Sequence, residues 1–100
     1  MTLELTRAAI VSDITPETAE LISGPEGDFW TLSWLPGRRL TREQAVHGMV
    51  LDEILSDPML LDDAEALELA AVRAAELGLE LERAVTLLCL RVVHRLSPAA

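Results

Sequence analysis

Hydrophobic and polar positions alternate in the first part of the chain and recur with a helical period in the second part. The clearest alternation, over residues 29–35, predicts a strand with Trp30, Leu32 and Trp34 on one face. A proline–glycine pair at positions 36 and 37 predicts a sharp end to this strand, because proline cannot donate a hydrogen bond to a strand ladder. The aromatic residues of the chain are therefore expected in one short β element.

The segment before this strand has two interpretations. Residues 2–14 alternate weakly, as in a half-buried strand. Thr15-Pro16-Glu17 has the composition of a helix start, with threonine as N-cap and proline at the first helical position. Alternatively, residues 20–23 form a strand that pairs with the next one through the glycine- and proline-rich turn at 24–28. Both interpretations remain open.

A helix is predicted to begin after Thr41 and to end at Ser56-Asp57-Pro58. Thr41 and Gln44 have the spacing of a capping box, in which each side chain accepts a backbone N–H of the other residue. The apolar stripe of this helix comprises Val46, Met49, Val50 and Ile54, and Glu43, His47 and Asp52 are expected off the stripe.

Two further helices are predicted, over residues 62–77 and 80–96. Gly78 is expected to end the first of them. The second is apolar over more than one stripe, which is typical of a helix that is central in its fold or that contacts another subunit. A homodimer through the helix at 80–96 is one expectation that follows.

Together these patterns predict one domain spanning residues 1–100. The fold class is α+β: a small antiparallel β element of two or three strands packed on about three α-helices, with an all-helical C-terminal half. The β-containing part covers residues 1–37 and the helical part covers residues 41–97.

The charge balance bears on the kind of partner. Seventeen acidic residues against eight basic ones give a net charge of −9. Such a chain is repelled by nucleic acid phosphates and complements a basic protein surface, although acidity also serves solubility alone. The single cysteine, Cys89, is expected to be a buried structural thiol in a reducing cytoplasm. No apolar run approaches the roughly 20 residues of a membrane span.

The stretch from Trp30 to Ala45 has the most distinctive combination of residue types in the sequence. It places two indoles and three guanidinium groups around one turn, and tryptophan and arginine dominate interface hot spots. The candidate interaction residues are Trp30, Trp34, Arg38, Arg39 and Arg42. The alternative is that the tryptophans pack the core and the arginines pair with nearby acids.

This stretch resembles a segment of small actinobacterial and actinobacteriophage proteins of unknown function, which carry a W-x-x-S-W-L-P-G-R run. The matching positions here are Trp30, Ser33 to Arg38, Leu40, Arg42, Gln44-Ala45 and Met49. Gly48 stands where that pattern leads us to expect alanine. The resemblance covers about a quarter of the chain and implies an origin in a high-GC bacterium or its phage, which agrees with the absence of lysine, asparagine and tyrosine. It implies no activity.

The sequence contains no catalytic, cofactor-binding or metal-binding motif that we recognise, so no catalytic residue, metal or cofactor is predicted. The preferred hypothesis is a small non-enzymatic protein–protein interaction module. One alternative is a nucleic-acid-binding regulator, because residues 40–45 resemble the opening of a helix-turn-helix helix. A small enzyme without a recognisable motif is the other alternative.

Overall fold

The computed structural model describes residues 3–60 and 62–96 of the chain, with five strands followed by three α-helices and one short 3₁₀ helix. The strands are β1 (Leu3–Leu5), β2 (Ala9–Ser12), β3 (Thr18–Gly24), β4 (Gly27–Leu32) and β5 (Leu35–Leu40). The helices are α1 (Arg42–Ser56), η1 (Pro58–Leu60), α2 (Ala64–Glu76) and α3 (Leu81–Leu96).

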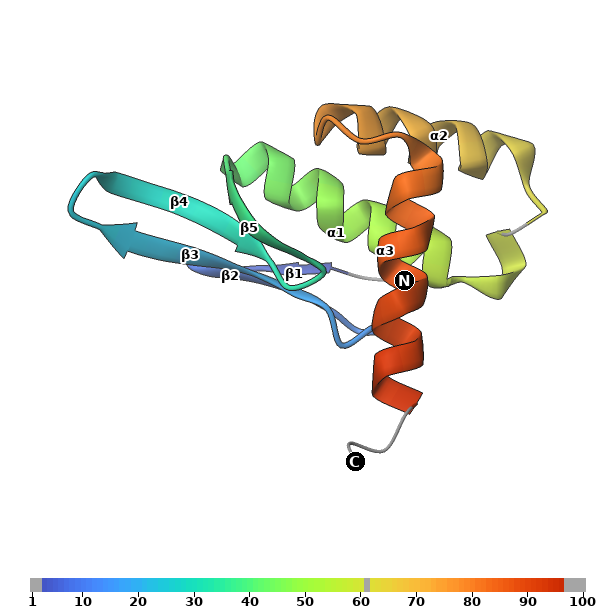
Figure 1. Ribbon diagram of the computed structural model, residues 1–100, viewed down its shortest axis with the longest axis horizontal. Coiled ribbons are helices and arrows are strands. Elements are labelled where there is room, and N and C mark those ends of the chain that lie inside the picture. The colour runs from blue at the N-terminus through green and yellow to red at the C-terminus, as the bar shows by residue number, and fades with distance from the viewer. Residues whose placement is uncertain (1–2, 61, 97–100) are drawn as a thin grey trace.

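The strands form a single antiparallel meander in the order β1-β2-β3-β4-β5 (Figure 1). Helix α1 packs against strands β2 to β5, α2 packs on α1, and α3 crosses the end of this assembly near α2. One face of the sheet is therefore buried. Ile10, Ala19, Trp30 and Leu32 point into the core, whereas Val11 and Ile22 of β2 and β3 are exposed.

The expectation of a small β element with two or three strands was wrong, because the sheet has five strands. One reason lies at β3, where the two sequence interpretations conflicted. Residues 19–24 pair with residues 27–32 of β4, and Gly27, the first residue of β4 after the turn, has a φ of 118°. The strand interpretation was correct, and Thr15-Pro16 starts no helix.

The second reason lies at the expected strand over residues 29–35. The chain reverses at Ser33-Trp34, so that Leu32 pairs with Leu35 and the segment is divided between β4 and β5. Pro36 and Gly37 lie within β5 rather than at a strand end. Proline is tolerated there because β5 is an edge strand, and Gly37 has a φ of 81°.

Helix α1 begins as predicted. The capping box of Thr41 and Gln44 is confirmed, with the threonine hydroxyl accepting the Gln44 N–H at 3.1 Å. The helix can lie close to the sheet because Gly48 faces Leu32. A Cβ at position 48 would be 2.2 Å from Leu32 Cδ1, well inside van der Waals contact.

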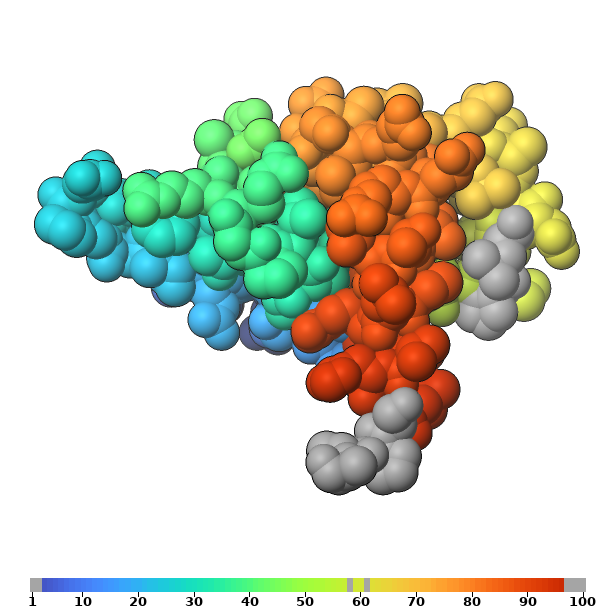
Figure 2. Space-filling model, viewed as in Figure 1, coloured from blue at the N-terminus to red at the C-terminus, as the bar shows by residue number. Residues whose placement is uncertain are grey.

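Helices α2 and α3 each bury two residues, but α2 packs along α1, whereas α3 packs on α2 at the edge of the molecule. Helix α2, capped by Asp63, buries Ala70 and Ala74. Helix α3 follows Gly78, which has a φ of 72°, and buries Ala84 and Leu88. Its C-terminal half projects beyond the body of the molecule in the space-filling view (Figure 2). Among the described residues, no helix is long and apolar enough to cross a membrane.

Candidate functional site

The two tryptophans of the predicted interaction patch lie in the core. Trp30 is 5% exposed and Trp34 is 1% exposed. Although Trp34 belongs to the β4–β5 turn, its indole points inward and its Nε1–H donates to the Gly48 carbonyl oxygen at 3.3 Å. This placement corresponds to the packing alternative for the tryptophans, because neither indole is presented on the surface.

Two of the three candidate arginines attach β5 and α1 to neighbouring parts of the chain. Arg38 donates to the Leu77 carbonyl oxygen at the end of α2, with a separation of 2.8 Å. Arg42 lies 5.4 Å from the centroid of the Trp30 ring and donates to the Thr6 carbonyl oxygen at 3.3 Å. Both arginines are exposed while they make these contacts.

The third candidate, Arg39, lies at the outer edge of the sheet. Its guanidinium is 4.8 Å from the Phe29 ring centroid and 3.8 Å from a Glu26 carboxylate oxygen. Both partners of this ion pair are largely exposed, so it contributes little stability. The arginine patch thus remains accessible, but without the indoles that were expected to anchor a partner.

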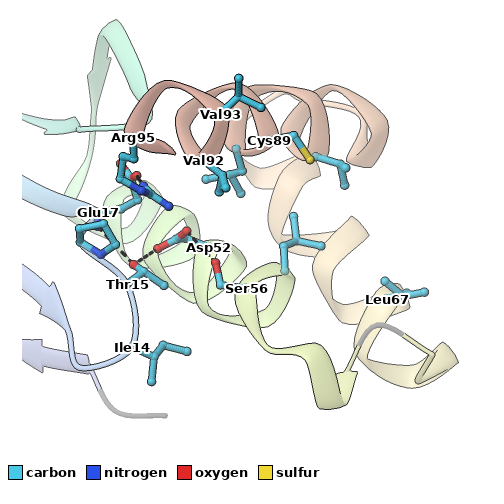
Figure 3. A pocket seen from close by; sticks show the side chains of 14 residues that line it. Ile14, Thr15, Glu17, Asp52, Ser56, Leu67, Cys89, Val92, Val93 and Arg95 are labelled. Carbon is cyan, nitrogen blue, oxygen red and sulfur yellow. Dashed lines mark hydrogen bonds and ion pairs between the residues drawn. The ribbon is translucent and has the colours of Figure 1, made fainter. Parts of the chain in front are cut away.

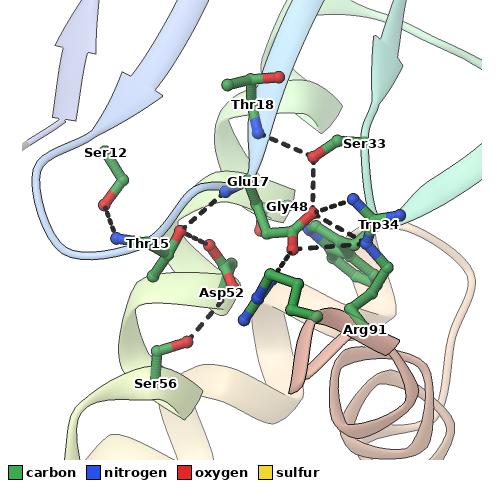
Figure 4. A network of polar contacts seen from close by, with 11 residues as sticks. Ser12, Thr15, Glu17, Thr18, Ser33, Trp34, Gly48, Asp52, Ser56 and Arg91 are labelled. Atoms are coloured by element: carbon green, nitrogen blue, oxygen red, sulfur yellow. Dashed lines mark hydrogen bonds and ion pairs between the residues drawn. The ribbon is translucent and has the colours of Figure 1, made fainter. Parts of the chain in front are cut away.

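A buried polar network is centred on Glu17, and it was not predicted from the sequence. Glu17, which is 1% exposed, accepts a hydrogen bond from Ser33 at 2.7 Å and ion-pairs with Arg91 at 3.1 Å and with Arg95 (Figure 4). Burial raises the pKa of Glu17, but the Ser33 and Arg91 hydrogen bonds and the two arginine charges outweigh it, so the pKa lies below its usual value. This carboxylate links the β2–β3 connection to α3.

Asp52 of α1 is the second buried carboxyl group, at 2% exposure. It accepts hydrogen bonds from the hydroxyls of Thr15 and Ser56, the latter at 3.3 Å. Burial raises its pKa to about 6, and the nearby Glu17 charge adds to the increase; the two hydroxyl hydrogen bonds and the Arg95 charge oppose it only partly. Among the described residues, no arginine or histidine forms an ion pair with Asp52.

The neighbouring Glu53 holds the loop that carries these groups. Its carboxylate accepts a hydrogen bond from the Ser12 hydroxyl at 2.7 Å. The same Ser12 oxygen accepts the backbone N–H groups of Ile14 and Thr15, at 3.1 and 3.3 Å. Residues 12–17 are therefore tied to α1 at two adjacent acidic positions, which fixes Thr15 and Glu17 relative to Asp52.

Thr15, Glu17 and Asp52 lie at one end of a pocket of about 680 Å³. The pocket is bounded by the 14–17 loop, α1, the start of α2 and α3 (Figure 3). Such a volume lies within the range of small-molecule binding pockets. The polar end is lined by Thr15, Glu17, Asp52, Ser56 and Arg95. The other lining residues are mostly apolar, namely Ile14, Pro16, Leu55, Leu67, Val85, Leu88, Cys89, Val92 and Val93.

The prediction for Cys89 was also wrong. It was predicted to be a buried thiol, but it is exposed on α3 and borders the pocket. The leucines around it misled the prediction because α3 lies at the edge of the molecule rather than at its centre. Within residues 3–60 and 62–96, no group of three or more potential metal ligands comes together.

A sequence signal for the buried acids existed in the spacing of α1. The expectation that Asp52 lies off the apolar stripe was wrong: it follows Ala45 by seven positions and Met49 by three, which places it on the buried side of the helix. Glu17 carried no comparable signal, because its partners Arg91 and Arg95 lie at the far end of the chain.

Chemically, the site offers an amphipathic pocket with one carboxylate neutralised by two arginines and another that lacks a cationic partner among the described residues. Comparison with models of known protein families, with curated proteins and with solved structures finds no match.

Proposed function

We propose that this protein is a non-enzymatic interaction module that binds another protein through α3. The observation that carries the proposal is an apolar seam on this helix. Val85, Cys89, Val92 and Leu96 recur at intervals of four, three and four residues, and we refer to these residues as the α3 seam. This is the spacing with which helices pack against one another.

The α3 seam is open to solvent. Val85, Val92 and Leu96 are 39%, 42% and 78% exposed, and Cys89 is exposed as well. Large apolar side chains in this arrangement mark interaction surfaces, because a monomer otherwise gains by covering them. A helix of the partner laid along the seam would bury them in the helix-in-groove mode.

Charge favours a basic partner over a second copy of this chain. A net charge of −9 attracts a protein with a basic surface and steers its approach, whereas two copies repel each other. The nucleic-acid alternative is disfavoured by α2, where Glu65, Glu68 and Glu76 oppose Arg73 alone. We place the interaction in the cytoplasm, the compartment that suits an unpaired cysteine.

The test compares three forms of the purified, tagged chain as bait in a nuclease-treated lysate of the source organism. The seam variant is Val92→Glu/Leu96→Glu. The control variant, Val11→Glu/Ile22→Glu, changes two residues of the sheet with 36% and 38% exposure. A basic protein that is retained by the wild type and the control, lost by the seam variant, and bound again as a purified pair supports the proposal.

Other outcomes overturn it. Capture that depends on nucleic acid would favour the regulator, and equal capture by all three forms would place the interface elsewhere. Light scattering of the bait alone identifies self-association; a dimer that the seam variant abolishes would assign the seam to a second copy. Circular dichroism must show equal helicity in all forms, since unfolding also abolishes binding.

A further inference from the structure

The pocket opens beside the α3 seam, and the two share residues. Val85, Cys89 and Val92 belong to the seam and also line the pocket. In the close view, Val92 points from α3 toward Asp52 and Ser56 on α1 (Figure 3). A partner helix on the seam would therefore lie at the pocket mouth, close enough to place a side chain inside.

The charged groups at the polar end of the pocket decide which charge the partner side chain would carry. The charged residues that line the pocket are Glu17, Asp52 and Arg95. Glu17 is already paired with Arg95 and Arg91, whose side chains are 38% and 42% exposed and therefore partly solvated. Asp52 is left with neutral hydroxyl partners at 2% exposure. A buried carboxylate in this state is stabilised most by a cation.

We propose that the pocket binds a lysine or arginine side chain of the partner protein, with the aliphatic stem along Leu55, Leu88 and Val92 and the cationic head at Asp52. The inference rests on the proposed function and names the contact that would anchor the partner. A long cationic side chain matches both ends of the pocket, because its methylene stem packs on apolar groups while its head pairs with a carboxylate.

The protonation state of Asp52 makes the inference sensitive to pH. Two charged groups act directly on Asp52, namely Glu17 of the 14–17 loop and Arg95 of α3. Two others contact the residues around it: Arg91 pairs with Glu17, and Glu53 accepts a hydrogen bond from Ser12. A bound cation stabilises the ionised form, so binding must lower the Asp52 pKa from about 6. Affinity must in turn fall as the pH drops below that value.

The test uses n-butylammonium, which reproduces the lysine side chain, and needs no partner protein. It is titrated into the isotopically labelled wild-type chain, with NMR detection of backbone amides and of the Asp52 carboxyl carbon. We expect saturable shifts at Asp52, Ser56 and Val92, and a decrease of about 1 unit or more in the Asp52 pKa. The apparent affinity should weaken about fivefold to tenfold between pH 7.5 and pH 5, because roughly one-tenth of Asp52 is ionised at pH 5 in the free protein.

Uncharged 1-pentanol and anionic butyrate at equal ionic strength separate charge recognition from apolar binding. Equal shifts with 1-pentanol, tighter binding of butyrate, or no saturable shift with n-butylammonium would overturn the inference. Asp52→Asn should lose the n-butylammonium response, while the matched control Asp28→Asn, in the distant β3–β4 hairpin, should keep it. No partner protein is present in this experiment. A negative result here would therefore not overturn the lysate result, and a negative lysate result would not overturn the pocket inference.

Discussion

At the scale of single residues, Asp52 is the most unusual feature of the molecule. It occupies the buried stripe of α1, where an apolar side chain would stabilise the fold by hydrophobic burial. A carboxylate there loses its hydration, and the described part of the chain gives it two hydroxyl hydrogen bonds in return. Such a residue is expensive for stability, and costly buried polar groups are typical of functional sites.

The cost of Asp52 can be measured through its pH dependence. Its pKa is about 6 in the folded chain against an ordinary 3.8, so the folded state binds more protons between these values. The free energy of unfolding contributed by this group therefore decreases as pH rises from 4 to 7, by about 2 kcal/mol.

Replacement Asp52→Asn should remove this decrease. The unfolding free energy of the wild type minus that of the variant should fall between pH 4 and pH 7, as measured by urea denaturation. Glu17 acts in the opposite sense: its stabilisation is present above pH 4.5 and is lost as pH falls through its lowered pKa, and it is common to both proteins. A difference that stays constant with pH would show that Asp52 is not perturbed.

At the scale of secondary structure, the contact between α1 and β4 depends on glycine. Gly48 lies in the middle of α1, where glycine costs about 1 kcal/mol in helix stability relative to alanine. Its value is the space it leaves for Leu32, which is 2% exposed, and for the Trp34 hydrogen bond to the Gly48 carbonyl. Glycine at this position thus has a packing reason.

Substitution Gly48→Ala should destabilise the protein by about 1–2 kcal/mol, because overpacking outweighs the gain in helix propensity. The added methyl group forces Leu32 out of its place in the core. In a double-mutant cycle, Leu32→Val should relieve the clash, so that Gly48→Ala is less harmful in that background. Purely additive effects would contradict this account of the contact.

At the scale of the whole molecule, α3 is the least firmly attached of the three α-helices. It buries only Ala84 and Leu88, and the ion pairs of Arg91 and Arg95 with Glu17 hold its C-terminal half to the body. Elements with little buried apolar area open locally without global unfolding. We expect the amides of α3 to exchange with solvent through such openings, faster than those of α1.

Replacing the central carboxylate should loosen α3 selectively. With Glu17→Gln, hydrogen exchange in residues 88–96 should accelerate about tenfold to a hundredfold, since hydrogen bonds to a charged group contribute roughly 1.5–3 kcal/mol. The control Glu26→Gln breaks the exposed pair with Arg39 and should leave α3 unchanged. Uniform acceleration across α1 and α3 would instead indicate that α3 opens only with the whole domain.

Local patterns were sufficient to predict the helical elements. The capping box at Thr41, the acidic start of α2 and the glycine after it act over a few residues, and each lies where the sequence placed it. The alternation of Trp30 and Leu32 likewise predicted which face of β4 is buried. Such signals can be read from the chain because both partners of each interaction are neighbours along it.

Tertiary structure alone decided the rest. The sheet has more strands than expected for two reasons. Residues of β3 are stabilised as a strand by pairing with β4. The chain also turns at Ser33-Trp34, which divides the expected strand into β4 and β5 and lets the Trp34 indole reach the core. The pocket needed Glu17 to meet Arg91 and Arg95 across more than seventy residues. Pairing between distant segments depends on the folded topology, which no local pattern of residues encodes.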